Sequence, residues 1–156
     1  MGTFTFRYAE ETDAALILRF IRELADYEKM LDEVIATEEL LKEWICEKKK
    51  AEVIFALEDG VEAGFALFFH NFSTFLGRAG IYLEDLYVSP QYRGKGYGKA
   101  TVKKVIEKCE ELSALKMVLG AKYDKKGFYE SLGFSTYGEI FEEEGIPHIM
   151  MQIEID

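Results

Sequence analysis

Three alternating glycines join an apolar strand pattern to an amphipathic helix pattern, and this junction constrains the fold more than any other feature of the chain. The strand pattern covers residues 81–88, and helical spacing of apolar residues runs from residue 101 to residue 112. At such a junction several backbone N–H groups and the positive end of a helix can face one anion, and a pyrophosphate is a natural ligand. The glycine-rich segment consists of Gln91, Tyr92, Arg93, Gly94, Lys95, Gly96, Tyr97 and Gly98.

Two familiar phosphate-binding loops are excluded by the spacing of this segment. A Walker loop requires glycine at position 93 and serine or threonine at position 100, where the chain has Arg93 and Ala100. The dinucleotide fingerprint requires GxGxxG, whereas the glycines here follow GxGxG. The glycines taken alone are equally compatible with a flexible surface turn, so the interpretation as a phosphate site depends on the flanking strand and helix.

The remaining patterns predict one mixed α/β (α+β) domain that spans residues 1–156. Only two prolines interrupt the chain, and no repeat or linker marks a second domain. We expect the order strand, two helices, three strands, helix, strand, helix and two strands, arranged as a mixed sheet with helices on both faces. The predicted strands cover 4–8, 51–57, 61–69, 81–88, 115–119, 134–140 and 148–155. The first helix is expected to be capped by Thr12 or Asp13, the second to follow Thr37, and the other two to cover 101–112 and 125–132.

Charge and cysteine content narrow the class of partner. The formal net charge of −10 argues against nucleic acid and favours cationic small molecules, although many proteins are acidic only for solubility. All 29 acidic residues lie outside residues 86–106, which keep five basic residues, as an anionic ligand would require. Cys46 and Cys109 lack the spacing of a disulfide framework or a zinc site, so we expect no metal. No export signal or segment of about 18 apolar residues is visible, so we expect a cytoplasmic protein without a membrane span.

The glycine-rich segment resembles the signature of the GNAT superfamily of N-acetyltransferases, which is Gln or Arg, two residues, Gly, one residue, then Gly or Ala. Gln91, Gly94 and Gly96 match it, and the predicted element order is also that of the superfamily. The resemblance implies a mostly antiparallel sheet of about seven strands, acetyl-CoA as co-substrate, and loop amides that hold its pyrophosphate. It also implies a strand bulge that frees a backbone N–H for the thioester oxygen. The residues expected to contact the cofactor are Leu86, Tyr87, Val88, the whole segment from Gln91 to Gly98, and Lys99.

Three shorter segments resemble the diamine acetyltransferases, the branch that acts on spermidine, spermine and thialysine. They are residues 21–28, residues 34–38 and the strand Tyr82-Leu83-Glu84-Asp85-Leu86-Tyr87-Val88. The resemblance implies a small cationic amine as acceptor, Glu84 as the group that takes its proton, and a homodimer. A solvated strand carboxylate is the alternative for Glu84. The residues expected to bind the acceptor are Asp26, Tyr27, Glu28, Glu84 and Asp85. Asp26 and Glu28 form an acidic cluster with Asp32 and Glu33 between the first two helices, and solvated surface acids are the alternative interpretation of this cluster.

The segment Phe128-Tyr129-Glu130-Ser131-Leu132-Gly133-Phe134 matches the superfamily's FYxxxGF motif, in which the tyrosine donates a proton or hydrogen bond to the leaving sulfur. Tyr129 is therefore the second expected catalytic residue, with ordinary helix packing as the alternative. Many relatives carry asparagine and a small residue upstream, where this chain has Lys122 and Lys126, so the pantetheine contacts there depart from the pattern.

The sequence is also compatible with two other functions, and three polar segments or residues are expected to be structural or solvated. The alternative functions are acetylation of another amine, such as an amino acid, an antibiotic or a protein lysine, and a coenzyme A sensor without turnover. We expect residues 142–144 to form an acidic loop tip, and His70 and His148 to be structural.

Overall fold

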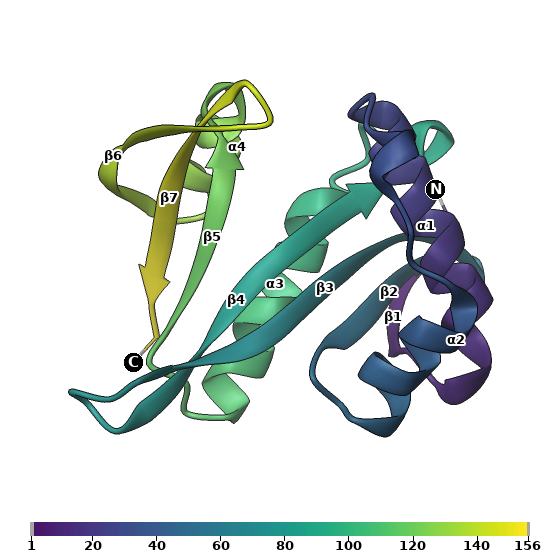
Figure 1. Cartoon of the computed structure of the whole chain (residues 1–156), viewed down its shortest axis with the longest axis horizontal. Helices are drawn as coiled ribbons and strands as arrows, with labels where there is room; N and C mark the ends of the chain where they lie inside the picture. The colour runs from purple at the N-terminus through teal and green to yellow at the C-terminus, as the bar shows by residue number, and fades with distance from the viewer. Residues whose placement is uncertain (1, 156) are drawn as a thin grey trace. The chain divides into compact units, whose positions relative to one another are not determined.

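The computed structural model describes residues 2–155. Its strands are β1 (Phe4–Tyr8), β2 (Glu52–Glu58), β3 (Val61–Ser73), β4 (Arg78–Val88), β5 (Lys116–Lys122), β6 (Ser135–Glu143) and β7 (Ile146–Glu154). Its α-helices are α1 (Ala14–Tyr27), α2 (Glu38–Leu41), α3 (Tyr97–Glu111) and α4 (Lys126–Glu130) (Figure 1). Short 3₁₀ turns occupy Glu11–Asp13, Leu31–Glu33, Pro90–Tyr92 and Tyr123–Lys125, and a π-helical turn occupies Lys42–Glu47.

The strands are hydrogen-bonded as one seven-stranded sheet in the order β1-β2-β3-β4-β5-β7-β6. The pairs β1–β2, β2–β3, β5–β7 and β6–β7 are antiparallel, and β4 runs parallel to β5 at Ile81–Met117 and Tyr82–Val118. The prediction of a mixed, mostly antiparallel sheet of about seven strands is therefore confirmed.

The chain forms two compact units. The first unit contains the chain up to Phe68 together with Asp85–Thr101, and the second contains Phe69–Glu84 together with the chain from Val102 onward. The strands β3 and β4 and the helix α3 each continue from one unit into the other.

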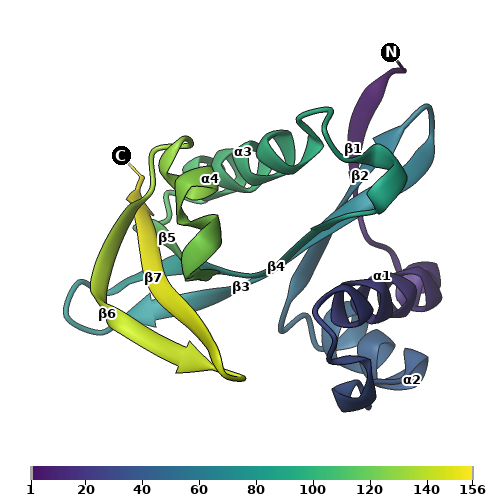
Figure 2. The same ribbon diagram turned by 90° about the horizontal axis from the view of Figure 1, so that it is seen from above.

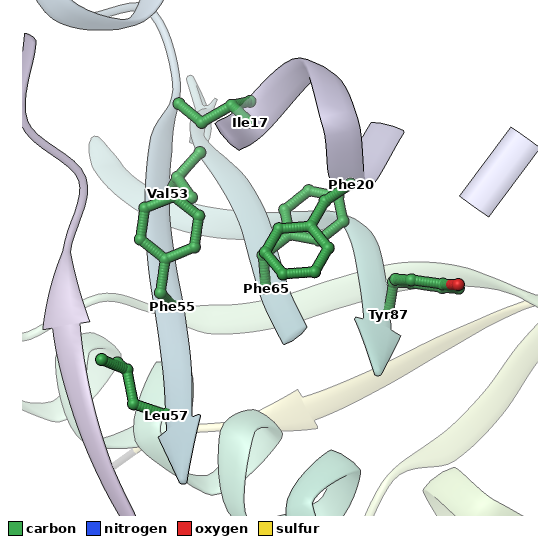
Figure 3. Packing of buried hydrophobic residues seen from close by; sticks show 7 residues of the cluster. All are labelled: Ile17, Phe20, Val53, Phe55, Leu57, Phe65 and Tyr87. Carbon is green, nitrogen blue, oxygen red and sulfur yellow. The ribbon is translucent and has the colours of Figure 1, made fainter. Parts of the chain in front are cut away.

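The core of the first unit lies between α1 and the strands. Ile17 and Phe20 on the inner face of α1 contact strand residues that include Phe55 and Phe65, and all four are fully buried. Figure 3 shows Phe20 over Phe65, whose rings stack with centroids 5.6 Å apart. Figure 2 shows α1 and α2 on one face of β1 and β2. The face of α1 that the apolar spacing marks is therefore the face that the helix buries.

The second unit is built on β5, β7 and β6, which follow one another in the sheet (Figure 1). Met117 and Met151, on paired strands, are fully buried, whereas every residue of β6 is exposed. The register of β6 against β7 shifts between Tyr137 and Phe141, where Gly138 has a φ of 73°. A glycine in the left-handed region is typical of such a bulge.

Candidate active site

The glycine-rich segment connects β4 to α3 within the first unit. The Ser89 N–H, after the last residue of β4, donates to the Ala63 carbonyl at 2.8 Å, and one 3₁₀ turn, Pro90–Tyr92, follows. Gly94 and Gly96 then have φ values of 81° and 83°, and α3 begins at Tyr97. A Cβ atom at either glycine would meet no other atom within 4 Å, so glycine is needed for its backbone conformation rather than for close packing. The loop therefore leads directly into the positive end of a helix, as an anion site requires.

Arg93 packs back onto the first unit. Its Nε donates to the Val88 carbonyl at 2.8 Å, and its guanidinium lies 4.5 Å from the ring centre of Tyr27 and 5.4 Å from that of Tyr87. Tyr27 is in the last turn of α1. Arg93 thus joins the predicted cofactor loop to the region predicted to bind the acceptor.

Lys95 is held by an acid that the sequence analysis did not single out. Its Nζ lies 2.8 Å from Oε1 of Glu58, and the same oxygen accepts a hydrogen bond from the Tyr97 hydroxyl. This hydrogen bond raises the pKa of Tyr97 to about 12, and the interaction with Lys95 lowers the pKa of Glu58. No local pattern marks Glu58, because its partners lie 37 and 39 residues away.

A second acid missed by the sequence analysis is Glu23, on α1. It accepts hydrogen bonds from the hydroxyls of Tyr87 at 3.2 Å and Ser89 at 3.0 Å, and Arg19 lies 3.4 Å away one helical turn earlier. Its carboxylate raises the pKa of Tyr87, after the larger effect of burial. Glu23 therefore connects α1 to the end of β4, beside the residues expected to contact the thioester.

The other predicted acceptor residues of the first unit lie at the surface or close to it. Asp26 is exposed, and Glu28 caps the C-terminus of α1 through its N–H to the Leu24 carbonyl at 3.0 Å. Asp85 is half-buried on β4. The bulge predicted near residues 86–88 stays a prediction.

Glu84 belongs to the second unit and lies on β4, next to the buried Leu83. Burial is the larger cause that raises the pKa of the Glu84 carboxyl, and the negative charge of Glu143 raises it further. By its accessible surface Glu84 is an exposed residue, so its carboxyl is only partly desolvated. A carboxylate with a raised pKa is a better proton acceptor than an ordinary glutamate, because its basicity is closer to that of an amine.

Tyr129 also belongs to the second unit and lies on α4. Its ring makes edge-to-face contacts with Phe128 at 5.0 Å and Phe134 at 5.8 Å, and burial raises its pKa to about 12. Gly133, with a φ of 100°, turns the chain so that the Phe134 N–H donates to the Tyr129 carbonyl at 3.1 Å. The FYxxxGF motif thus forms one local aromatic cluster, in which the phenol stays protonated at neutral pH.

The acidic run 142–144 lies at the end of the β6–β7 hairpin, so the prediction of a loop tip holds for Glu144, while the run begins within the strand. Glu142 and Glu143 end β6, and Glu144 is in the turn. Oε2 of Glu143 on β6 lies 3.6 Å from Nε2 of His148 on the paired strand β7. His148 is buried, and its ring stacks on that of Phe141. The strand register places the charge of Glu143 close enough to affect Glu84, which the sequence pattern could not reveal.

The lysines that depart from the superfamily pattern lie at the end of β5 and the start of α4. Lys122 pairs in register with His148, and the Lys126 ammonium lies 5.2 Å from the ring centre of Tyr123. Both cysteines are free thiols; Cys109 is buried and Cys46 is partly exposed. Over residues 2–155, no group of three or more potential ligands could hold a metal ion, and none of the helices is long and apolar enough to cross a membrane.

Comparison with known proteins agrees with the fold. Residues 9–155 match the family model of the acetyltransferase (GNAT) domain. A thialysine N-epsilon-acetyltransferase from Bos taurus is 41% identical over 118 residues, which cover 69% of this chain and 68% of that protein. An L-ornithine N5-acetyltransferase from Arabidopsis thaliana is 35% identical over 86 residues, which cover 53% of this chain and 38% of that protein. The structure of yncA from Salmonella typhimurium, solved with its cofactor acetyl-CoA, has a TM-score of 0.80 at 22% identity and covers 98% of this chain and 94% of its own.

The chain belongs to the GNAT family of acetyltransferases. It is an acetyl-CoA-dependent N-acetyltransferase, and its acceptor group is an amine.

Proposed function

We propose that the enzyme transfers the acetyl group to a primary amine of a small cationic acceptor, namely a polyamine, a diamine or thialysine. The observation that carries the proposal is the 41% identity to thialysine acetyltransferases over two thirds of the chain. The L-ornithine acetyltransferase among the relatives also acts on a small molecule with a side-chain amine. The exposed acid Asp26 and the partly buried Glu28 at the end of α1 suit a cationic ligand.

The first step is removal of a proton from the acceptor. An alkylammonium has a pKa of about 10.4, so only a small fraction is neutral at pH 7, and only the neutral amine can attack a thioester. In our proposal the Glu84 carboxylate attracts the ammonium and accepts its proton, directly or through water. Its raised pKa, due to burial and to Glu143, favours this role.

The second step is the departure of the thiolate. In our proposal Tyr129 donates its O–H hydrogen bond or proton to the leaving sulfur, and its pKa of about 12 keeps the phenol protonated at neutral pH. A backbone N–H among Leu86, Tyr87 and Val88 stabilises the oxyanion. In the same proposal the segment Gln91–Gly98 and Lys99 hold the pyrophosphate of acetyl-CoA.

The test is thiol release from acetyl-CoA in the presence of a panel of amines. The proposal predicts turnover with thialysine, ornithine, putrescine or spermidine, and far less with aminoglycosides or a lysine peptide. Turnover only with the last two would move the enzyme to another acceptor class. Binding of acetyl-CoA without release for any amine would instead support a sensor. The homodimer expected from the family resemblance remains a prediction, which light scattering of the purified protein would check.

A further inference from the structure

One carboxylate contacts the glycine-rich loop on both sides of Gly96. Oε1 of Glu58 lies 2.8 Å from Nζ of Lys95 and accepts a hydrogen bond from the Tyr97 hydroxyl. The Lys95 and Glu58 side chains are 35% and 15% exposed, so the glutamate side chain is largely covered while the Lys95 ammonium still reaches solvent. All of these residues belong to the first unit.

Glu58 itself is held by the sheet. It is the last residue of β2, and it pairs in register with Phe4 on β1 and Val61 on β3. The turn that follows, Asp59–Gly60, has positive φ at both residues and fixes the end of the strand. The carboxylate therefore projects from a backbone that is paired on both sides.

Tyr97, the first residue of α3, is also fixed. The residue is 4% exposed, and its ring stacks on Phe4 with the centroids 4.2 Å apart and the planes 9° apart. Its carbonyl accepts a hydrogen bond from the Thr101 hydroxyl at 2.7 Å. The start of the helix is thus packed on the β1–β2 pair, and the stretch before it contains Gly94 and Gly96, whose positive φ values suit glycine.

We propose that Glu58 is a positioning residue for acetyl-CoA binding, and that Lys95 acts through its pairing with Glu58 rather than as a ligand of the pyrophosphate. By holding Lys95 and Tyr97, Glu58 keeps Gly96 and the N-terminus of α3 in the conformation that presents backbone N–H groups to the anion. The inference rests on the proposed role of the segment Gln91–Gly98 in binding the pyrophosphate.

Two roles for Lys95 predict opposite changes in the affinity for acetyl-CoA when Glu58 is replaced by the neutral glutamine. If the Lys95 ammonium bound the pyrophosphate, Glu58 would compete for it, and Glu58→Gln would tighten binding. If Glu58 orders the loop, Glu58→Gln leaves a less organised loop that must be ordered on binding, so acetyl-CoA binds more weakly. The glutamine still accepts a hydrogen bond from Tyr97, so the substitution removes mainly the ionic partner of Lys95.

Titration calorimetry with acetyl-CoA distinguishes the two roles. We expect Glu58→Gln and Lys95→Met each to raise the Kd by about two- to five-fold, the range typical of a partly exposed ion pair. The double variant should be no weaker than either single one, because both changes break the same contact. Glu107→Gln, an exposed position on α3 with the same change in charge, is the control and should leave the Kd unchanged. Tighter or equal binding by Glu58→Gln would overturn the inference.

A charge swap separates positioning from a loss of folding. Glu58→Lys and Lys95→Glu should each weaken acetyl-CoA binding, and the double swap should recover most of the affinity with kcat at saturating acetyl-CoA close to that of the wild type. A double swap as weak as Lys95→Glu alone would show that Lys95 contacts the phosphates and would overturn the inference. If the unmodified protein bound no acetyl-CoA, the proposed role of the loop would fail and this inference would fail with it. If the wild type bound acetyl-CoA and Glu58→Gln bound it equally well, only the inference about Glu58 would be overturned.

Discussion

At the scale of single residues, the Tyr129 hydroxyl can be tested without disturbing its surroundings. Tyr129→Phe keeps the ring contacts with Phe128 and Phe134 and removes only the O–H group. We expect kcat to fall about 100-fold, as when one donor to a developing charge is lost, with little change in the KM for acetyl-CoA. Steady-state kinetics check this, and an equal loss in kcat and in cofactor affinity would remove the assigned role.

The carboxyl of Glu84 should set the acidic limb of the pH profile. Its pKa is raised by burial and by Glu143, so kcat/KM should begin to fall, as the pH is lowered, above the pH expected for an ordinary glutamate. Glu143→Gln removes a negative charge, which favours the ionised form of Glu84 and lowers its pKa. The acidic limb should therefore move to lower pH in this variant.

The matched control for that shift is Glu139→Gln, an exposed acid on the same strand, β6, for which we expect an unchanged profile. A profile of Glu143→Gln that moved to higher pH, or that stayed in place, would contradict the assignment of Glu84 as the proton acceptor.

At the scale of structural elements, the loop depends on backbone conformations that only glycine adopts easily. Gly94→Ala places a side chain at a φ of 81°, where the left-handed conformation costs about 1–2 kcal/mol. Because no neighbouring atom crowds this position, the strain should appear as altered loop geometry, and we expect acetyl-CoA binding to weaken about ten-fold. Titration calorimetry measures the effect.

Gly77→Ala provides the comparison for that variant. Gly77 also has a positive φ, 65°, and open space at its Cβ, but it lies in the turn between β3 and β4. The Gly77→Ala variant should lose about as much stability in thermal unfolding as Gly94→Ala, but it should keep its affinity for acetyl-CoA. An equal loss of affinity in both variants would mean that the Gly94 effect is general destabilisation.

Elements with strong local signals were predicted well from the sequence. Asp59 and Gly60 form the turn between β2 and β3 with positive φ at both residues, and the Thr37 hydroxyl accepts the Leu40 N–H at 3.1 Å at the start of α2. The continuation of α2 differs, because after Leu41 the helix widens into a π-helical turn over Lys42–Glu47. Apolar spacing alone does not distinguish i+4 from i+5 hydrogen bonding. The cap of α1 also differs, since the Asp13 carboxylate binds Arg7 and the Glu10 N–H instead of capping α1.

The candidate site was predictable only where its chemistry is local in the chain. The glycine-rich segment and the FYxxxGF motif each lie within about eight residues, and the structure forms both as continuous pieces. The partners Glu58, Glu23 and Glu143 come from distant segments, brought in by strand register and helix packing. A single sequence carries no signal for such contacts, because the residues are ordinary surface acids until the chain folds.

At the scale of the whole molecule, stability depends partly on an ion-pair network in the first unit. Arg7 on β1 donates two hydrogen bonds to Asp13, at 2.8 and 2.9 Å, and one to Glu62 on β3 at 2.9 Å, and it covers the ring of Phe55. Hydrogen bonds from Arg7 lower the pKa values of both carboxyls. A carboxyl whose pKa is lowered by folding stabilises the folded state at pH values above its unfolded-state pKa of about 4. This stabilisation is lost as the pH falls through the pKa of the carboxyl in the folded state.

We therefore expect Arg7→Met, which keeps the apolar stem over Phe55, to lower the free energy of unfolding by about 1–2 kcal/mol at pH 7. The difference from the wild type should shrink as the pH falls below about 4, because the carboxyls are then becoming protonated. Urea unfolding at pH 7 and pH 3 measures both values. A difference that grew on acidification would contradict this sign.

The most direct test of the account is calorimetric titration of coenzyme A into the folded protein. If the segment Gln91–Gly98 holds the pyrophosphate, the unmodified chain should release or absorb heat that saturates at one coenzyme A per chain, and Gly94→Ala should need a higher concentration to saturate. A folded protein that gives no binding heat over a range of temperatures would contradict the assignment of this loop, and with it the catalytic roles proposed for Glu84 and Tyr129.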